Sequence, residues 1–262
     1  MSRDIWDPAT YSRYADERSR PFFDLVSRVR ADDPDYVVDA GCGTGELTAT
    51  LANRWPKATV DGFDGSPAMI GKARELDATP RFTVADVTTW RPDRPVDVLV
   101  SNAVLQWVPS HRDVIGHWVE ALAPGGWLAF QVPGNFDAPS HLAIRQLCAS
   151  KEWSDRLGDF DKGRPVGDPV EYLDLLSGHR CQVDTWETTY VHVLQGDDPV
   201  LNWISGTALR PIFDRLARDE QKRFTGQLAD LLAAAYPART YGTPFPFRRV
   251  FVVARKGSEG ES

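Results

Sequence analysis

The sequence has few cysteines and no long apolar run, and both absences exclude classes of protein. It contains 3 cysteines in 262 residues, Cys42, Cys148 and Cys181, and they lie far apart. An odd number of widely spaced cysteines favours a reduced setting over a disulfide framework. No apolar run approaches the length that crosses a bilayer, and the first residues lack the apolar core of a signal peptide. We therefore expect a cytoplasmic protein without a membrane partner.

Metal-ligand spacing and an excess of positive charge are also missing. The 5 histidines do not combine with acids or cysteines at the spacing of metal ligands, so we predict no metal site. Acidic residues outnumber basic ones by 37 to 30, and the net charge of −7 argues against nonspecific nucleic-acid binding. The length suits one large α/β domain or a domain with an inserted subdomain. Protein partners cannot be inferred from the sequence.

A glycine-rich turn follows the first strand-like run of the chain. The segment 36–46 reads as a buried strand with Asp39 near its end, followed by Gly41, Gly43 and a third glycine. Glycines at such a turn let the backbone approach a cofactor, and the next helix N-terminus offers free N–H groups. The dinucleotide fingerprint requires Gly or Ala where this chain has Glu46, which disfavours a nicotinamide cofactor. The pattern resembles motif I of the Rossmann-like methyltransferases that use S-adenosyl-L-methionine (SAM).

Two further strand-like runs also end in acids. Asp64 closes the run 58–64, about twenty residues beyond the turn, where an acid can accept hydrogen bonds from ribose hydroxyls. The run 82–87 contains Asp86. In SAM enzymes an acid at this place commonly faces the adenine amino group, and an apolar residue such as Val87 packs on the ring. Acids closing successive strands of one α/β repeat therefore predict a SAM site.

Strands and helices alternate regularly up to Val132, which predicts a parallel sheet with helices on both faces. Ser66 is the predicted N-cap of the helix after the second strand. Beyond Val132, segments 181–194 and 247–255 alternate like long strands, and 199–236 is mostly helical. We expect a Rossmann-like α/β fold of parallel strands with a C-terminal antiparallel strand and a helical cap. The expected domains are an N-terminal helical lid (1–30), a SAM-binding core (31–195), a helical cap (196–246), a final core strand (247–256) and a disordered tail (257–262).

Several arginines outside the core lie among apolar or turn-forming residues and not in charge runs. They are Arg18, Arg20, Arg210, Arg248 and Arg249. A guanidinium in such a setting suits bidentate capture of a carboxylate, and each one alone is also typical of a surface ion pair. The aromatic residues near them, among them Tyr11, Trp107 and Tyr190, are equally compatible with core packing.

Segments spread over the whole chain match those of a known family. They are Trp6-Asp-Pro-x-x-Tyr11, Arg18-Ser-Arg-Pro21, Asp39-x-Gly-Cys-Gly-x-Gly45, Asp64-x-Ser-Pro-x-Met69, Ser101-Asn-Ala-x-Leu-Gln-Trp-Val-Pro109, Trp186-x-Thr-Thr-Tyr190 and Phe245-Pro-Phe-Arg-Arg249. With these segments the chain resembles the bacterial trans-aconitate 2-methyltransferases. The segment around Asn102 and Gln106 and the C-terminal Pro-Phe-Arg-Arg are more specific to this group than the glycine and acid motifs. One departure is Gly65, where we expect Ser.

The resemblance implies methyl transfer from SAM to a carboxylate of trans-aconitate, which gives a monomethyl ester and S-adenosylhomocysteine (SAH). A carboxylate is already ionised at neutral pH, so it needs positioning and no general base. Arginines are expected to hold the non-reacting carboxylates of this polycarboxylic acid. The implied cofactor residues are Arg20, Asp39, Gly41, Gly43, Asp64, Gly65, Met69, Asp86, Val87, Asn102 and Gln106. The implied substrate residues are Tyr190, Arg210, Arg248 and Arg249, with Tyr11 and Trp107 as catalytic residues beside the methyl group.

Other functions stay open at this point. The same machinery would act on another small carboxylic acid if Trp203, Phe213 and Phe245 lined a pocket without buried arginines. A SAM-binding protein without catalysis is a second alternative, against which the acids at successive strand ends count. Arg20 is expected on the SAM carboxylate, with the substrate as the alternative.

Overall fold

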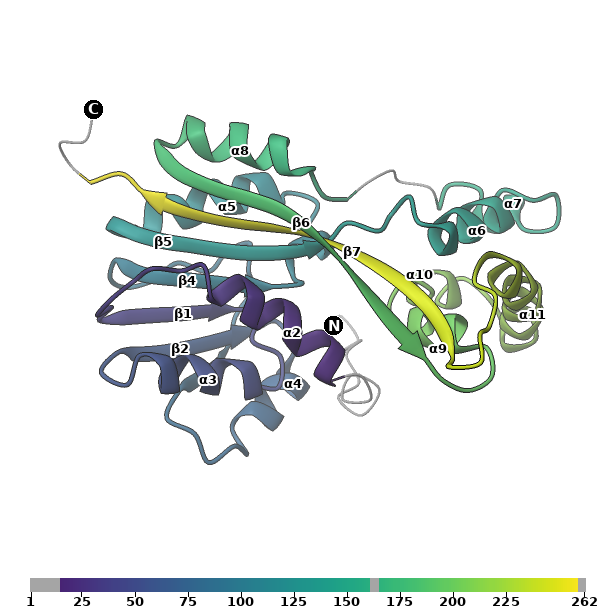
Figure 1. Ribbon diagram of the computed structural model, residues 1–262, viewed down its shortest axis with the longest axis horizontal. Helices are drawn as coiled ribbons and strands as arrows, with labels where there is room; N and C mark the ends of the chain where they lie inside the picture. Colours follow the sequence, from purple (N-terminus) through teal and green to yellow (C-terminus); the bar gives the residue numbers. More distant parts are fainter. Residues whose placement is uncertain (1–14, 161–164, 259–262) are drawn as a thin grey trace. The chain divides into compact units, whose positions relative to one another are not determined.

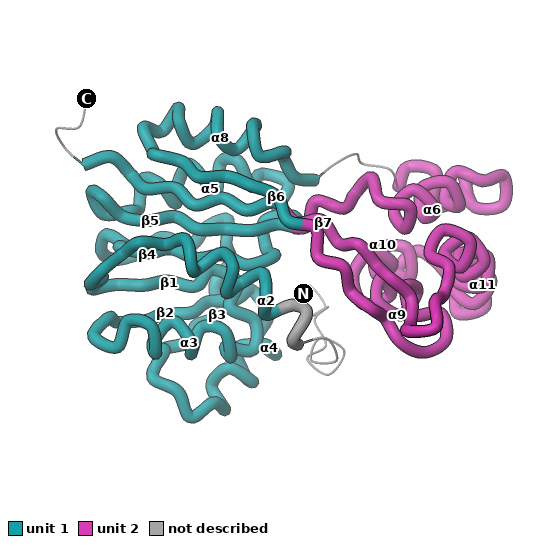
Figure 2. The backbone as a smooth tube through the Cα atoms, in the orientation of Figure 1, with its two compact units in different colours: residues 1–132, 165–188, 250–262 teal, residues 133–164, 189–249 magenta. Residues whose placement is uncertain are grey.

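The computed structural model describes residues 15–160 and 165–258 of the chain (Figure 1). The chain divides into two compact units (Figure 2). Unit 1 contains the chain up to Val132, Pro165–Thr188 and the chain from Val250 onward, and unit 2 contains Pro133–Arg164 and Thr189–Arg249. The predicted domains assign residues 133–164 to the core, whereas the structure groups this segment with Thr189–Arg249. The predicted tail is described only to residue 258.

The strands form one seven-stranded sheet in the order β3-β2-β1-β4-β5-β7-β6. Parallel pairing joins β1 to β2 and β4, β2 to β3, and β4 to β5. The C-terminal strand is antiparallel, so the sheet is mixed, as the sequence predicts. The strands are β1 (Tyr36–Ala40), β2 (Thr59–Asp64), β3 (Arg81–Val84), β4 (Val96–Asn102), β5 (Leu122–Pro133), β6 (Cys181–Leu194) and β7 (Thr243–Lys256).

Helices of unit 1 flank the strands (Figure 1). The predicted N-cap is confirmed, because the Ser66 hydroxyl accepts a hydrogen bond from the Met69 N–H at 3.2 Å. The first described helix begins at Ala15 and ends at Val26, and it buries Phe22 and Leu25. The helices are α2 (Ala15–Val26), α3 (Glu46–Arg54), α4 (Pro67–Ala73), the 3-10 helix η1 (Leu105–Trp107), α5 (His111–Ala121) and α8 (Pro169–Gly178).

Strand β5 begins earlier than the sequence suggests. The pattern predicts a strand only from Trp127, with the preceding proline and glycines as the end of a helix. In the structure Leu122 already pairs with Val96, and the register shifts before Trp127 pairs with Val98. Gly125 has a φ of 76°, a conformation that glycine adopts without strain. The glycines therefore form a bulge inside the strand, where a sequence pattern alone favours a turn.

Unit 2 is mostly helical, as predicted for residues 199–236. Its longest helix, α11, packs against α6 and α9 and buries Phe224 and Leu228. A ring cluster joins Tyr190, His192, Trp203, Phe245 and Phe247, and in it His192 and Trp203 stack at 4.8 Å between centroids. The helices are α6 (Pro139–Cys148), α7 (Ser154–Leu157), α9 (Pro199–Ser205), α10 (Arg210–Phe213) and α11 (Arg218–Ala235). No helix in the described parts of the chain is long and apolar enough to cross a membrane.

Candidate functional site

The glycine turn after β1 combines a closed position with an open one. Gly41, Gly43 and Gly45 all have positive φ, at 81°, 56° and 84°. A Cβ on Gly41 would lie 2.2 Å from Val104 Cγ2, whereas a Cβ on Gly43 would meet no described heavy atom within 4 Å. Gly41 is therefore required for packing. Gly43 leaves its backbone accessible, which is what a closely bound cofactor needs.

Asp64 lies directly beside this turn. Its carboxylate accepts the Gly43 N–H at 3.0 Å and the Ser66 N–H at 2.8 Å. The acid at the end of β2 thus fixes the loop after β1, and the two predicted cofactor residues Asp64 and Gly43 are in contact. Gly65 follows as an exposed residue, and Met69 is buried one turn into α4.

Asp39 is buried at the end of β1. Thr48 donates a hydrogen bond of 2.6 Å to Asp39 Oδ2, while the buried Oδ1 has no hydrogen-bond partner within residues 15–160 and 165–258. The pKa of Asp39 is raised to about 7, mainly by burial and to a lesser extent by the charge of Asp64, while the Thr48 hydrogen bond opposes the shift. A buried carboxylate oxygen without a partner is suited to a ligand that brings a donor or a positive charge.

Asp86 lies just beyond β3 and is exposed. Its Oδ1 accepts the Thr88 N–H at 2.8 Å and the Thr88 hydroxyl at 2.7 Å, and these hydrogen bonds lower the Asp86 pKa. The carboxylate is therefore ionised and oriented. Val87 is half-buried beside it.

Two more of the predicted cofactor residues lie at the end of β4 and in the following helix η1. Asn102 Oδ1 accepts a hydrogen bond from Gln131 at 2.6 Å. Gln106 donates to the Ala103 carbonyl at 2.7 Å, and its buried Oε1 has no partner among the described residues. Because β1, β2, β3 and β4 are parallel, their carboxyl ends share one edge of the sheet. The structure therefore collects these cofactor candidates at that edge.

The structure shows different amounts about the remaining candidates from the first half of the chain. Tyr11 lies outside the described residues. Arg20 lies on α2 with its side chain 71% exposed, and it pairs with Asp24 at 4.0 Å. Trp107 ends η1 and is 44% exposed. Their predicted roles stay predictions.

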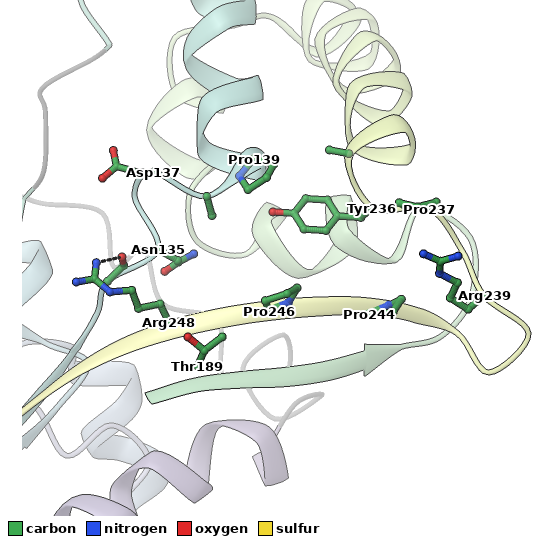
Figure 3. A pocket seen from close by; sticks show the side chains of 13 residues that line it. Asn135, Asp137, Pro139, Thr189, Tyr236, Pro237, Arg239, Pro244, Pro246 and Arg248 are labelled. Carbon is green, nitrogen blue, oxygen red and sulfur yellow. Dashed lines mark hydrogen bonds between the residues drawn. The ribbon is translucent and has the colours of Figure 1, made fainter. Parts of the chain in front are cut away.

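In unit 2, strand β7 separates the two neighbouring arginines of the C-terminal motif. Alternate residues of a strand point to opposite faces. Pro244, Pro246 and Arg248 line a pocket of about 600 Å³ (Figure 3). On the other face, the Arg249 guanidinium lies 4.8 Å from the centre of the Phe247 ring. Arg248 and Arg249 therefore do not share one pocket.

The other predicted substrate residues lie elsewhere in unit 2. Tyr190 is 3% exposed and its ring stacks on His192 at 6.5 Å between centroids. Arg210 begins α10 and is half-buried. Arg248 is held by a hydrogen bond of 2.7 Å from its Nη1 to the Gly134 carbonyl.

The sequence did not identify several polar residues of the pocket, among them the three that come next. Asn135, Tyr236 and Arg239 line it together with Arg248. They come from separate segments, and none belongs to a motif with a fixed spacing. The proline content around 237–246 was the available signal, because prolines beside a strand pattern mark an irregular strand end. No group of His, Cys, Asp and Glu that could hold a metal occurs in the described part of the chain.

Comparisons with known proteins give consistent results over the whole chain. A methyltransferase-domain family model matches residues 14–215. A trans-aconitate 2-methyltransferase of Mycobacterium sp. (strain KMS) is 52% identical over 256 residues, which cover 97% of this chain and 100% of the relative. The Streptomyces coelicolor protein of the same name is 50% identical over 96% of this chain and 86% of its own length.

Solved structures support the fold alone. The plantazolicin methyltransferase BpumL, determined in complex with SAH, superposes with a TM-score of 0.52 at 14% identity and covers 96% of this chain and 91% of its own. The [4+2]-cyclase SpnF has a TM-score of 0.55 at 15% identity over 92% and 82% of the two chains. Because this fold carries both a methyltransferase and a cyclase, it does not determine the reaction.

Proposed function

Because this chain belongs to the trans-aconitate 2-methyltransferase family, we propose that it methylates a carboxylate of trans-aconitate with SAM as methyl donor. The products are a monomethyl ester and SAH. The observation that carries the proposal is the near-complete coverage of both chains at about half identity, for example 52% over 97% of this chain. It extends through the segments outside the SAM-binding part, which are the ones that select an acceptor.

The chain's residues at the sheet edge fit SAM. Gly43 leaves space against its backbone, and Asp39 Oδ1 and Gln106 Oε1 are buried acceptors without partners among the residues described. These oxygens are suited to the amino group of the methionine part, and Asp64 and Asp86 to the ribose hydroxyls and adenine. SAM supplies an electrophilic methyl group on a sulfonium. The turn and the acids would hold and orient it.

The acceptor needs no base from the protein. Carboxylates have ordinary pKa values near 4, so the acid arrives ionised and its oxygen takes the methyl group without any proton transfer. Arg248 is proposed to hold a non-reacting carboxylate, whereas Arg210 and Arg249 do not line the Arg248 pocket. A strong ion pair on the reacting carboxylate would lower its nucleophilicity, so positive charge is more useful on the others.

The test is methyl transfer from labelled SAM to a panel of acids. Trans-aconitate should give the highest kcat/KM, followed by other tricarboxylates such as cis-aconitate, with little or no product from a fatty acid. Mass spectrometry should show one added methyl group and equimolar SAH. Preference for a monocarboxylic acid would replace the proposed acceptor while keeping the chemistry. Binding of SAM without transfer to any acid would instead identify a non-catalytic SAM-binding protein.

A further inference from the structure

The pocket in unit 2 contains a buried amide group without a partner. Asn135 is 4% exposed, and its Nδ2 has no hydrogen-bond partner within the described chain. An unpaired buried N–H group destabilises a fold, so a site usually retains one only when something else accepts from it. Asn135 lines the same pocket as Arg248, and Figure 3 shows both at one end of it.

A second donor comes from Tyr236. Its hydroxyl oxygen accepts the Ser140 N–H at 3.1 Å, at the first turn of the ten-residue helix α6. No described residue accepts the hydroxyl hydrogen, which is therefore available to the pocket. Accepting from the positive end of a helix polarises the hydroxyl and makes it a better donor. Figure 3 shows the Tyr236 hydroxyl on the side of the pocket where Asn135 and Pro139 lie.

Charge in the pocket is predominantly positive. Arg248 and Arg239 both line it, and Figure 3 shows Arg239 near Pro237 at the other end from Arg248. The turn that presents Arg239 is closed by backbone hydrogen bonds in both directions between Arg239 and Gly242. Among the described lining residues the one acidic side chain is that of Asp137, and Arg145 forms an ion pair with it at 3.5 Å.

We infer that this pocket binds the non-reacting carboxylates of the polyacid acceptor, with Asn135 and Tyr236 donating hydrogen bonds beside the Arg248 guanidinium. The donors at this end match a carboxylate, which accepts several hydrogen bonds at once. Arg239 at the other end favours an acid with more than one carboxylate. The walls between the two ends are apolar, formed by Pro139, Pro237, Pro244 and Pro246, and suit a short carbon skeleton. The inference rests on the proposed function and adds two acceptor-binding residues that no motif contains.

The experiment measures binding and turnover separately. Tricarballylate, a saturated tricarboxylate that resembles trans-aconitate, is titrated by calorimetry into the protein saturated with SAH. Asn135→Asp keeps the side-chain size and places a negative charge among the acid's carboxylates, so Kd should rise about tenfold to a hundredfold. Asn135→Ala should raise Kd about threefold to tenfold, because one hydrogen bond to a charged group is lost. Asn53→Asp, on the exposed side of α3, is the control for added charge and should bind like the wild type.

Turnover separates this inference from the proposed function. The Asn135 variants should raise KM for trans-aconitate by similar factors and leave the affinity for SAH unchanged, which also shows that they fold. If the wild type methylates trans-aconitate but Asn135→Asp binds and reacts normally, the pocket assignment is overturned and the function stands. If the wild type does not methylate trans-aconitate, the function fails. The pocket assignment then survives only if tricarballylate binds and Asn135→Asp weakens that binding.

Discussion

The two units build their candidate sites from different chemical groups, namely backbone groups in unit 1 and side chains in unit 2. In unit 1 backbone groups form much of the site. The Gly43 backbone is accessible, and the Gly43 and Ser66 N–H groups hold the Asp64 carboxylate. In unit 2 side chains form the site, and they come from segments that are distant in the sequence. Arg248 is bound to the Gly134 carbonyl 114 residues away. A site made from a turn leaves a local sequence motif, whereas a site made by tertiary packing does not.

The largest effect is expected from breaking the backbone site at its closed position. Gly41→Ala combines a φ of 81° with a Cβ 2.2 Å from Val104 Cγ2, so it should destabilise the fold by on the order of 3 kcal/mol. Gly43→Ala is the matched control. It meets no described atom within 4 Å, so it should cost about 1 kcal/mol of stability and act mainly on SAM binding. Chemical denaturation and SAH titration distinguish the two. Equal stability of both variants would contradict this reading of the turn.

Removing the acid that fixes the turn should act on the cofactor. Asp64→Ala removes a carboxylate that accepts the Gly43 and Ser66 N–H groups and is proposed to bind ribose. The affinity for SAM should fall by about 1–3 kcal/mol in calorimetry, the usual cost of leaving buried polar groups unpaired. Asp77→Ala, an exposed acid in the same unit, controls for the change in net charge. An unchanged SAM affinity would remove Asp64 from the site.

A substitution in the unit 2 pocket should affect the acceptor and leave the cofactor affinity nearly unchanged. Arg248→Lys keeps the charge but loses the planar fork, so kcat/KM for trans-aconitate should fall about tenfold to a hundredfold while SAM affinity stays nearly constant. Arg218→Lys, exposed at the start of α11, should leave both unchanged. Steady-state kinetics with each substrate varied provide the measurement. A parallel loss of SAM affinity would mean that Arg248 acts on the cofactor or on the fold.

The smallest effect is a pH dependence of stability from Asp39. Its folded-state pKa is raised from 3.8 to about 7, so its contribution is fully present below pH 4 and is lost as pH rises toward 7. Asn imitates the protonated form and still offers an oxygen to Thr48. The stability of Asp39→Asn relative to the wild type should therefore increase between pH 5 and pH 6.5, by on the order of 1–2 kcal/mol. Urea denaturation at both pH values measures it, and a constant difference would exclude a raised pKa.

Much of the fold was predictable from the sequence. The period-2 pattern gives β6 over Cys181–Leu194 as observed, and the Ser66 cap is local chemistry that the helix start reproduces. The early start of β5 was not predictable, because Gly125 and its neighbours look like a turn until their pairing partner on β4 is known. The grouping of residues 133–164 with unit 2 was missed for the same reason, since α6 belongs there through its packing on α11.

The residues of the candidate sites also separate into those that local sequence predicts and those that only tertiary packing reveals. Asp39, Gly43 and Asp64 follow from spacing, because each stands at a fixed offset from a strand end. Asn135 and Tyr236 do not, since a single asparagine or tyrosine is unremarkable until the fold encloses it. Sequence also could not separate Arg248 from Arg249, because a prediction of which face each residue occupies requires the exact strand register.

The alternation along β7 has a consequence for how this family can diversify. Residues 244, 246 and 248 face the pocket, while 245, 247 and 249 face the ring cluster and the buried interior of unit 2. Point substitutions at even positions can alter the choice of acid without disturbing the packing that odd positions maintain. A single-residue insertion or deletion before Pro244 would exchange the two sets and place phenylalanines in the pocket and prolines in the core. Relatives with new acceptors should therefore differ here by substitution and keep the length of this segment constant.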